Sequence, residues 1–189
     1  KGWSPTDLKS VLSLRKDGSH NPPKRVESGI PFIAGASDVK HFVIDFSKCS
    51  FITKEDCDQI HKTWEIKPND ILLTIVGTIG NVAIVTEDDL PFSLQRSLAV
   101  LRPNEKIDYT FLYFLLTNNK FEQFLYANIN PTGQPGIYLG MLGNFEFILP
   151  PKPLIEKFFI TSKNIISILQ KNHSSINSLT KTRDALLPK

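Results

Sequence analysis

The chain has 189 residues, of which 41% are hydrophobic and 22% are charged, a balance that is typical of globular proteins and excludes a disordered chain. No stretch is apolar for long enough to cross a membrane, and two cysteines are too few for a disulfide framework, so we expect a cytoplasmic protein. The net charge of +3 excludes a protein that simply coats nucleic acid, because residues 152–189 carry +5 and residues 1–151 carry −2.

Residues 1–149 alternate short β-branched or aromatic runs with turn residues. The first part is expected to contain a short strand or turn over Trp3–Leu14, a loop over 15–29, strands at Ile30–Ile33 and Phe42–Phe46, a connection over Ser47–Ile52 and a helix over Lys54–Thr63. Thr53 is expected to cap this helix, because its hydroxyl can accept a hydrogen bond from the backbone of Asp56.

The second part of this region continues the pattern. We expect strands at Ile71–Val76 and Asn81–Val85 joined by a turn over Gly77–Gly80, a strand at Leu98–Leu101, a helix over Tyr109–Tyr126, a loop over Asn128–Gly136 and a strand at Phe145–Leu149. The sequence therefore predicts an α+β fold: a mixed or antiparallel β-rich domain over residues 1–149 with a few short helices.

The composition changes at Pro150. Pro150, Pro151 and Pro153 form a stiff junction, and residues 154–187 contain neither glycine nor proline. Heptad spacing predicts a long coiled-coil-like helix over residues 150–189. One side of this helix carries an apolar stripe that a single polar residue interrupts. The stripe consists of Ile155, Phe158, Ile165, Leu169, Asn172, Ile176, Leu179 and Leu186. We expect the helix to pair with a second copy or a second half of the protein; docking along its own domain is the alternative.

Several patterns suggest chemistry. Lys16, His20, Lys24 and Arg25 place donors on or beside an expected loop, which suits contacts to phosphates and base edges. The loose spacing of Asp45, Glu65 and Lys67 permits a metal-dependent nuclease as an alternative, whereas the set His41, Cys49, Cys57 and His61 lacks the close cysteine pairs of zinc sites. No Walker loop, Gly-x-Ser-x-Gly elbow or dinucleotide fingerprint is present. We expect neither catalysis nor a bound metal in this chain.

The order of several segments resembles the DNA-specificity subunits of type I restriction–modification systems. Each segment alone is weak evidence, but their order and spacing are more specific. The segments are Lys16–His20 with Gly29–Ile33, Lys67–Thr74 through Gly77–Ala83, Leu94–Pro103, Phe111–Tyr113, Leu149–Pro151 and Ser178–Lys189.

This resemblance implies a non-catalytic half-subunit, the C-terminal half, which reads one half of a bipartite target in double-stranded DNA. Methyltransferase and restriction subunits would dock on it and would carry AdoMet, ATP and Mg²⁺ themselves. Met141 is the only methionine, so we expect Lys1 to lie inside a longer protein. A protein-interaction adaptor without a DNA role remains an alternative. The expected DNA-contacting residues are Lys16, Ser19, His20, Lys24, Arg25, Thr78, Gln95, Arg96, Gln134 and Tyr138.

Overall fold

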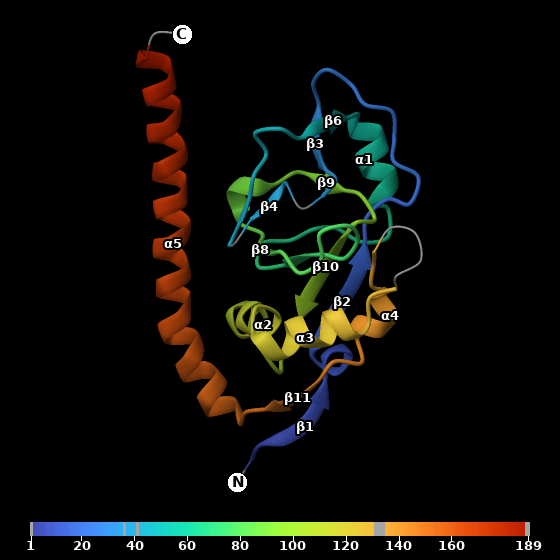
Figure 1. Cartoon of the computed structure of the whole chain (residues 1–189), viewed down its shortest axis with the longest axis vertical. Coiled ribbons are helices and arrows are strands. Elements are labelled where there is room, and N and C mark those ends of the chain that lie inside the picture. The colour runs from blue at the N-terminus through green and yellow to red at the C-terminus, as the bar shows by residue number, and fades with distance from the viewer. Residues whose placement is uncertain (1, 36, 41, 131–134, 188–189) are drawn as a thin grey trace.

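The computed structural model describes residues 2–35, 37–40, 42–130 and 135–187. A mixed body is followed by one long helix that rises along its side and stands apart from it over the upper part of its length (Figure 1). The N-terminus and the start of the long helix lie at the same end of the body. This arrangement confirms the expected α+β class with a long C-terminal helix.

A four-stranded antiparallel sheet in the order β2-β10-β7-β8 forms the centre of the body. Its strands are β2 (Leu12–Asp17), β7 (Ile71–Thr74), β8 (Val82–Ile84) and β10 (Leu98–Pro103). Successive side chains of a strand point to opposite faces, and Leu73 and Leu72 accordingly enter two different core clusters. The sheet is therefore covered on both faces, and all four residues of β7 are buried.

Smaller sheets complete the body. β3 (Ile30–Ile33) lies between β6 (Ser50–Ile52) and the parallel strand β9 (Ser93–Leu94). Two antiparallel ribbons pair β4 (Val39–Lys40) with β5 (Val43–Ile44) and β1 (Ser4–Asp7) with β11 (Glu146–Leu149). The β1–β11 ribbon lies at the end of the body where the long helix begins (Figure 1).

One of the predicted shorter helices is divided in two. The predicted helix over Tyr109–Tyr126 is two helices, α2 (Tyr109–Leu116) and α3 (Asn119–Ala127). The side chain of Asn118 accepts a hydrogen bond from the backbone of Phe121 at 2.9 Å and so starts a new helix. The remaining helices are α1 (Lys54–Ile60), α4 (Leu139–Leu142) and the 3-10 turns at Leu8–Val11 and Glu87–Asp89.

Other boundaries also required correction. The loop predicted over 15–29 begins later, because β2 continues to Asp17, and the connection predicted over 47–52 contains β6. The expected strand at Phe42–Phe46 is reduced to β5, and the helix after Thr53 ends at Ile60. Thr53 does cap that helix by accepting a hydrogen bond from the backbone of Asp56 at 3.1 Å.

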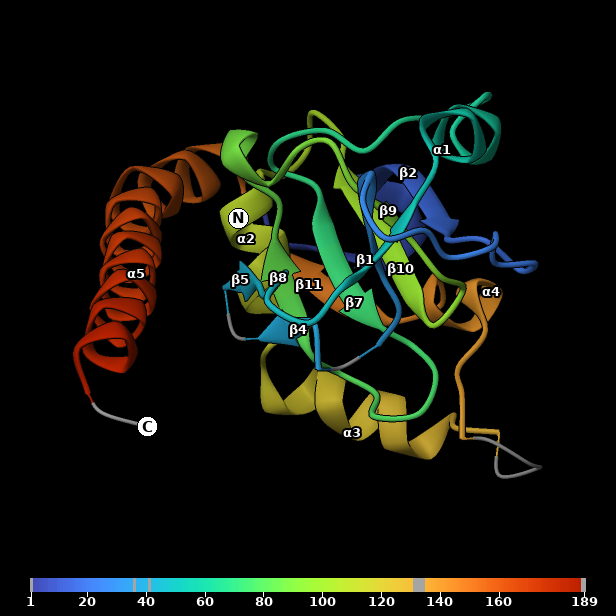
Figure 2. The same ribbon diagram turned by 90° about the horizontal axis from the view of Figure 1, so that it is seen from above.

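The long helix α5 (Lys152–Leu186) begins directly after Pro151, with Pro153 in its first turn, where a missing N–H costs no helical hydrogen bond. Its main contact with the body is α2. Seen from above, α5 and α4 lie on opposite sides of the body (Figure 2). Among the described residues, no helix is both long and apolar enough to cross a bilayer.

Candidate nucleic-acid interface

Two segments with candidate DNA contacts meet beside the end of β2. The backbone N–H of Ser19 donates to the carbonyl of Leu94 at 2.9 Å, and that of Arg96 donates to the carbonyl of Ser19 at 3.1 Å. Gly18 permits this approach, since a Cβ there would lie 2.1 Å from the Leu94 oxygen. Ser19 and His20 are thus held beside Gln95 and Arg96, which are distant in sequence.

A third segment closes the site. After β7, the backbone N–H of Ile137 donates to the carbonyl of Ile75 at 2.9 Å, and Val76 bridges to Gly136. These pairings bring Tyr138 and α4 to the same side of the body. The result is a cleft of 470 Å³, which lies within the range of about 300–1,000 Å³ that is typical of ligand sites. It is lined by Asp17, His20, Ile75, Val76, Arg96, Asn130, Gly136, Ile137, Tyr138 and Leu139.

The polar groups of this cleft are arranged as donors and acceptors. Nε2 of His20 lies 2.9 Å from Oδ2 of Asp17. The amide of Asn130 donates to the hydroxyl of Tyr138 at 3.3 Å, and the ring of Tyr138 is 72% exposed. Arg96 is exposed, and no carboxylate among the described residues forms an ion pair with it. A cationic donor, an aromatic face and an oriented imidazole therefore lie around one opening.

Other candidate residues lie elsewhere. Lys16 is an exposed residue within β2, opposite Val100, and not on a loop. Thr78 is exposed on the β7–β8 turn, beside a separate hollow of 300 Å³. Gln134 lies outside the described residues. The nine candidates that the structure describes therefore do not form one continuous surface.

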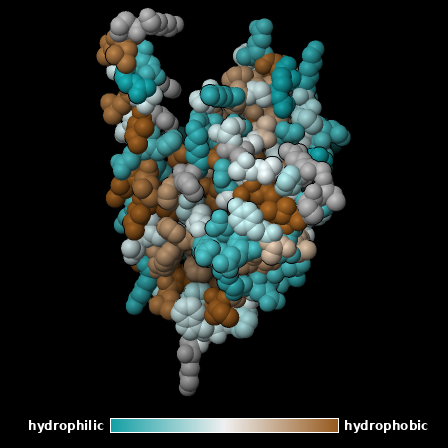
Figure 3. All heavy atoms as spheres, in the orientation of Figure 1, coloured by the Kyte–Doolittle hydropathy of each residue, from teal (hydrophilic) through white to brown (hydrophobic). Residues whose placement is uncertain are grey.

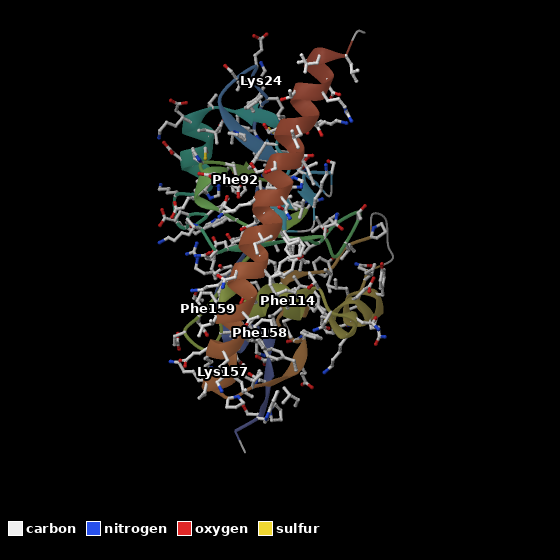
Figure 4. All side chains as sticks on the ribbon, turned by 90° about the vertical axis from the view of Figure 1, so that its left-hand side faces the viewer. Lys24, Phe92, Phe114, Lys157, Phe158 and Phe159 are labelled. Atoms are coloured by element: carbon white, nitrogen blue, oxygen red, sulfur yellow. The ribbon has the colours of Figure 1, made fainter. Side chains whose placement is uncertain are left out.

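Lys24 and Arg25 lie on the loop that follows His20 in the chain. Lys24 lies at the end of the body far from the start of α5 (Figure 4). The guanidinium of Arg25 stacks 4.1 Å above the ring of Phe32 and donates to the carbonyl of Pro23 at 3.0 Å. Through these contacts Arg25 has a structural role, because they hold the loop against Phe32 whether or not Arg25 also contacts DNA.

Two polar side chains of the cleft, Asp17 and Asn130, are not among the expected DNA contacts. Asp17 falls within the loop predicted over 15–29, and Asn130 lies in a polar segment without a recognisable motif. The closeness of Asp17 and His20 in sequence was the one available signal, since a carboxylate three residues before a histidine can reach its ring when a turn follows the strand.

The residues of the alternative nuclease reading are engaged in ion pairs. Lys40 contacts Asp45, and Lys40 and Ser47 together hold the pKa of the Asp45 carboxyl far below its usual range. Lys67 lies 2.8 Å from Glu65 and lowers the pKa of that carboxyl too. In the described part of the chain, no three His, Cys, Asp or Glu side chains are grouped to hold a metal ion.

One face of α5 is fixed to the body. Ile155, Ser162 and Ile166 are buried, and the hydroxyl of Ser162 donates to that of Thr110 on α2 at 2.7 Å. These positions follow each other at the spacing of one helical face. Ile155, a member of the predicted apolar stripe, is therefore buried against its own body.

The neighbouring flank of α5 is apolar and open. Phe158 packs edge-to-face on Phe114 of α2, with ring centroids 5.5 Å apart, and both rings stay partly exposed (Figure 4). Above them, apolar side chains gather along the helix (Figure 3). Leu169 is half-buried and Asn172 exposed. The other members of the expected stripe on this helix are exposed: Ile165, Ile176, Leu179 and Leu186.

Comparison with known proteins adds a family. The sequence profile described as "Type I restriction modification DNA specificity domain" matches residues 1–189. The Escherichia coli type I restriction enzyme EcoBI specificity subunit is 26% identical over 95% of this chain and 40% of that subunit. The Methanocaldococcus jannaschii MjaIX specificity subunit is 25% identical over 100% of this chain and 43% of that subunit.

Solved structures show the same fold. A type I restriction–modification S subunit from M. genitalium superposes with a TM-score of 0.67 at 17% identity, covering 98% of this chain and 43% of that one. The HsdS subunit from Thermoanaerobacter tengcongensis gives 0.52 at 19% identity, covering 96% and 40%. The chain thus spans less than half the length of the relatives that it matches.

Proposed function

Because the chain belongs to the type I restriction–modification DNA specificity family, we propose that it reads one half of a split DNA target and that α5 sets the distance to the other half. The observation that carries this proposal is the meeting of His20, Arg96 and Tyr138 around one cleft, with the paired residues Ser19 and Gln95 directly beside them in the chain. The body supplies the reading groups, and residues 150–189 supply the spacer.

The chemistry around the cleft suits base edges. Arg96 can donate two hydrogen bonds to the O6 and N7 atoms of guanine, and the amide of Gln95 matches the N6 and N7 atoms of adenine. Gln95 is half-buried and fixed through its backbone N–H, which donates to Ile33 at 3.0 Å. A residue on a fixed backbone reads bases more selectively than one on a flexible loop.

The open flank of α5 suits a second helix of the same kind, supplied by a second copy or by the other half of a longer subunit. Thirty-five residues at about 1.5 Å each give a rod of about 52 Å. Dimeric DNA readers fix the spacing of their half-sites through such rigid connections. Asn172, the polar member of the stripe, would set the register of the pair.

The remaining subunits complete the proposal. We assign methyl transfer to a methyltransferase subunit and cleavage to a restriction subunit that assemble on this chain, and no catalytic step to the chain itself. In support of this division, no three His, Cys, Asp or Glu side chains among the described residues are grouped to hold the Mg²⁺ that a nuclease needs.

The reading role is tested by the methylated motif. Arg96→Ala in the subunit assembled with its methyltransferase is expected to change one half of the motif and leave its spacing unchanged, as read from long-read sequencing of methylated adenines. Lys24→Ala, a matched loss of one exposed cation, should weaken binding without changing the motif. An unchanged motif in both variants would contradict the placement of the reading site in the cleft.

The spacing role is tested on the two flanks of α5. Ile176→Lys with Leu179→Lys places two charges in the apolar stripe and is expected to abolish pairing, measured as mass by sedimentation. Ser174→Lys with Ser178→Lys adds the same charge on the other flank, where both residues line a groove facing the body. Equal loss of pairing in both variants would contradict the assigned flank.

A further inference from the structure

Asp17 and His20 form an isolated pair at the mouth of the cleft. Asp17 is the last residue of β2 and lies opposite Ala99 in the ladder with β10, so its backbone is fixed by the central sheet. Its carboxylate reaches His20 at 2.9 Å, while the imidazole itself is 64% exposed. The carboxylate is thus built into the body, and the ring is presented to whatever enters.

The contact between Asp17 and His20 determines which nitrogen of the His20 ring faces a ligand. A carboxylate only accepts hydrogen bonds, so the Nε2 atom beside Asp17 must carry the proton. In a neutral imidazole the other nitrogen, Nδ1, is then an acceptor. Arg96, another lining residue of the cleft, offers donors only. Among its polar groups the cleft consequently presents an acceptor at Nδ1 of His20 and donors on Arg96.

We propose that Nδ1 of His20 accepts a hydrogen bond from the exocyclic amino group of an adenine or a cytosine, and that Asp17 is the positioning residue that makes this selection. In the major groove these amino groups are the donors, whereas guanine and thymine present oxygen acceptors that would face the lone pair of Nδ1. Phosphate oxygens are rejected for the same reason. This inference rests on the proposed DNA-reading function.

The charged and titratable groups that face the ring are few. Among the lining residues of the cleft they are Asp17, Arg96 and Tyr138. A purely structural Asp17 would leave the base preference unchanged when it is replaced, so base selection distinguishes the two roles.

The test combines protein variants with base analogues. The chain, assembled with its methyltransferase subunit, is used to select binding sites from randomised duplexes at pH 8. Asp17→Ala is expected to lower the preference for an amino-bearing base at one position about tenfold, the scale of a good base contact. Asp17→Asn keeps an acceptor for Nε2 and should preserve most of the preference. Asp58→Ala, which removes an exposed partner of Lys54 on α1, is the matched control.

The selected position is then probed by deleting the amino group. Replacing adenine by purine, or cytosine by 2-pyrimidinone, should weaken wild-type binding about tenfold and leave Asp17→Ala binding unchanged. The analogue that acts also identifies the base.

Each contrary result has a distinct meaning. If the wild type selects a motif and Asp17→Ala selects the same one, the proposed function stands and the role of Asp17 is overturned. If the position that changes carries guanine or thymine at pH 8, the acceptor role of Nδ1 is overturned. A wild type that selects no motif overturns the DNA-reading function and this inference together. Thermal unfolding of Asp17→Ala verifies that the body remains folded.

Discussion

The body buries its apolar side chains, whereas the upper part of the long helix leaves them exposed. In β10, the run Leu98–Leu101 is completely buried between two core clusters. In α5, no described side chain after Ile166 is buried, and even the apolar side chains of Ile176 and Leu179 are 60% and 69% exposed. An apolar pattern alone therefore predicts that a surface will be covered, but not by which part of the molecule. The body covers its own surface, while the upper part of α5 has apolar surface that a partner can cover.

The largest expected effect belongs to an ion pair in the body. Arg102 donates from Nε and Nη2 to the two carboxylate oxygens of Asp70 at 2.7 and 2.8 Å, and the backbone of Lys67 donates to the same group at 2.8 Å. Asp70 is completely buried, so Asp70→Ala leaves the guanidinium without its carboxylate partner. We expect a loss of about 3–5 kcal/mol in the free energy of unfolding, measured with urea.

The matched change in the helix should do almost nothing. Asp184 of α5 also contacts an arginine, Arg183, at 2.7 Å, but both side chains are exposed. Asp184→Ala is expected to change stability by less than about 0.5 kcal/mol. Similar losses in the two variants would show that the two regions do not differ as their burial indicates.

The second prediction compares two isoleucines of α5. Ile166 is buried against the body, and Ile168 is 58% exposed. Ile166→Ala is expected to cost about 2–4 kcal/mol through lost burial and a cavity, while Ile168→Ala should cost less than about 0.5 kcal/mol. Urea unfolding at a concentration where the chain is monomeric measures both. Equal values would mean that α5 does not dock on the body in solution.

The sequence predicts local features of the body better than its long-range contacts. The Gly77–Gly80 turn between β7 and β8 was predicted because apolar strands flank two glycines, and Gly77 and Gly80 indeed have positive φ. The break between α2 and α3 was missed because apolar periodicity continues across it. Only the cap made by Asn118 ends the pattern.

The cleft and the docked face of α5 could not be predicted from local patterns. The cleft requires Gly18 to pack on the Leu94 carbonyl and Val76 to bridge to Gly136, two pairings between distant segments. For α5, the heptad pattern identifies an apolar stripe but not which side of it meets the body. The contact with Thr110 places Ser162, a polar residue, on the buried face.

The third prediction concerns this junction. The Ser162 hydroxyl donates to Thr110 and also lies 2.7 Å from the carbonyl of Phe158, so its removal affects a buried contact between the two regions. Ser162→Ala is expected to cost about 1–2 kcal/mol and to increase hydrogen exchange in the lower half of α5. Ser174→Ala, an exposed serine of the same helix, is the control. No change in exchange would indicate that apolar packing alone holds the helix.

The smallest expected effect is a pH dependence of the body. His61 follows α1, and its Nε2 lies 3.0 Å from the hydroxyl of buried Ser93. Burial lowers the pKa of His61, so the unfolded chain, with an imidazole pKa of about 6.5, binds a proton at higher pH than the folded chain. Stability should therefore be full above pH 7 and should fall as the pH drops below 6.5, until the folded protein is protonated as well. In His61→Asn this part of the decline should disappear, as measured by thermal unfolding between pH 7.5 and 5.5. An unchanged slope would show that other groups of the body, and not the imidazole behind β9, bind the proton on unfolding.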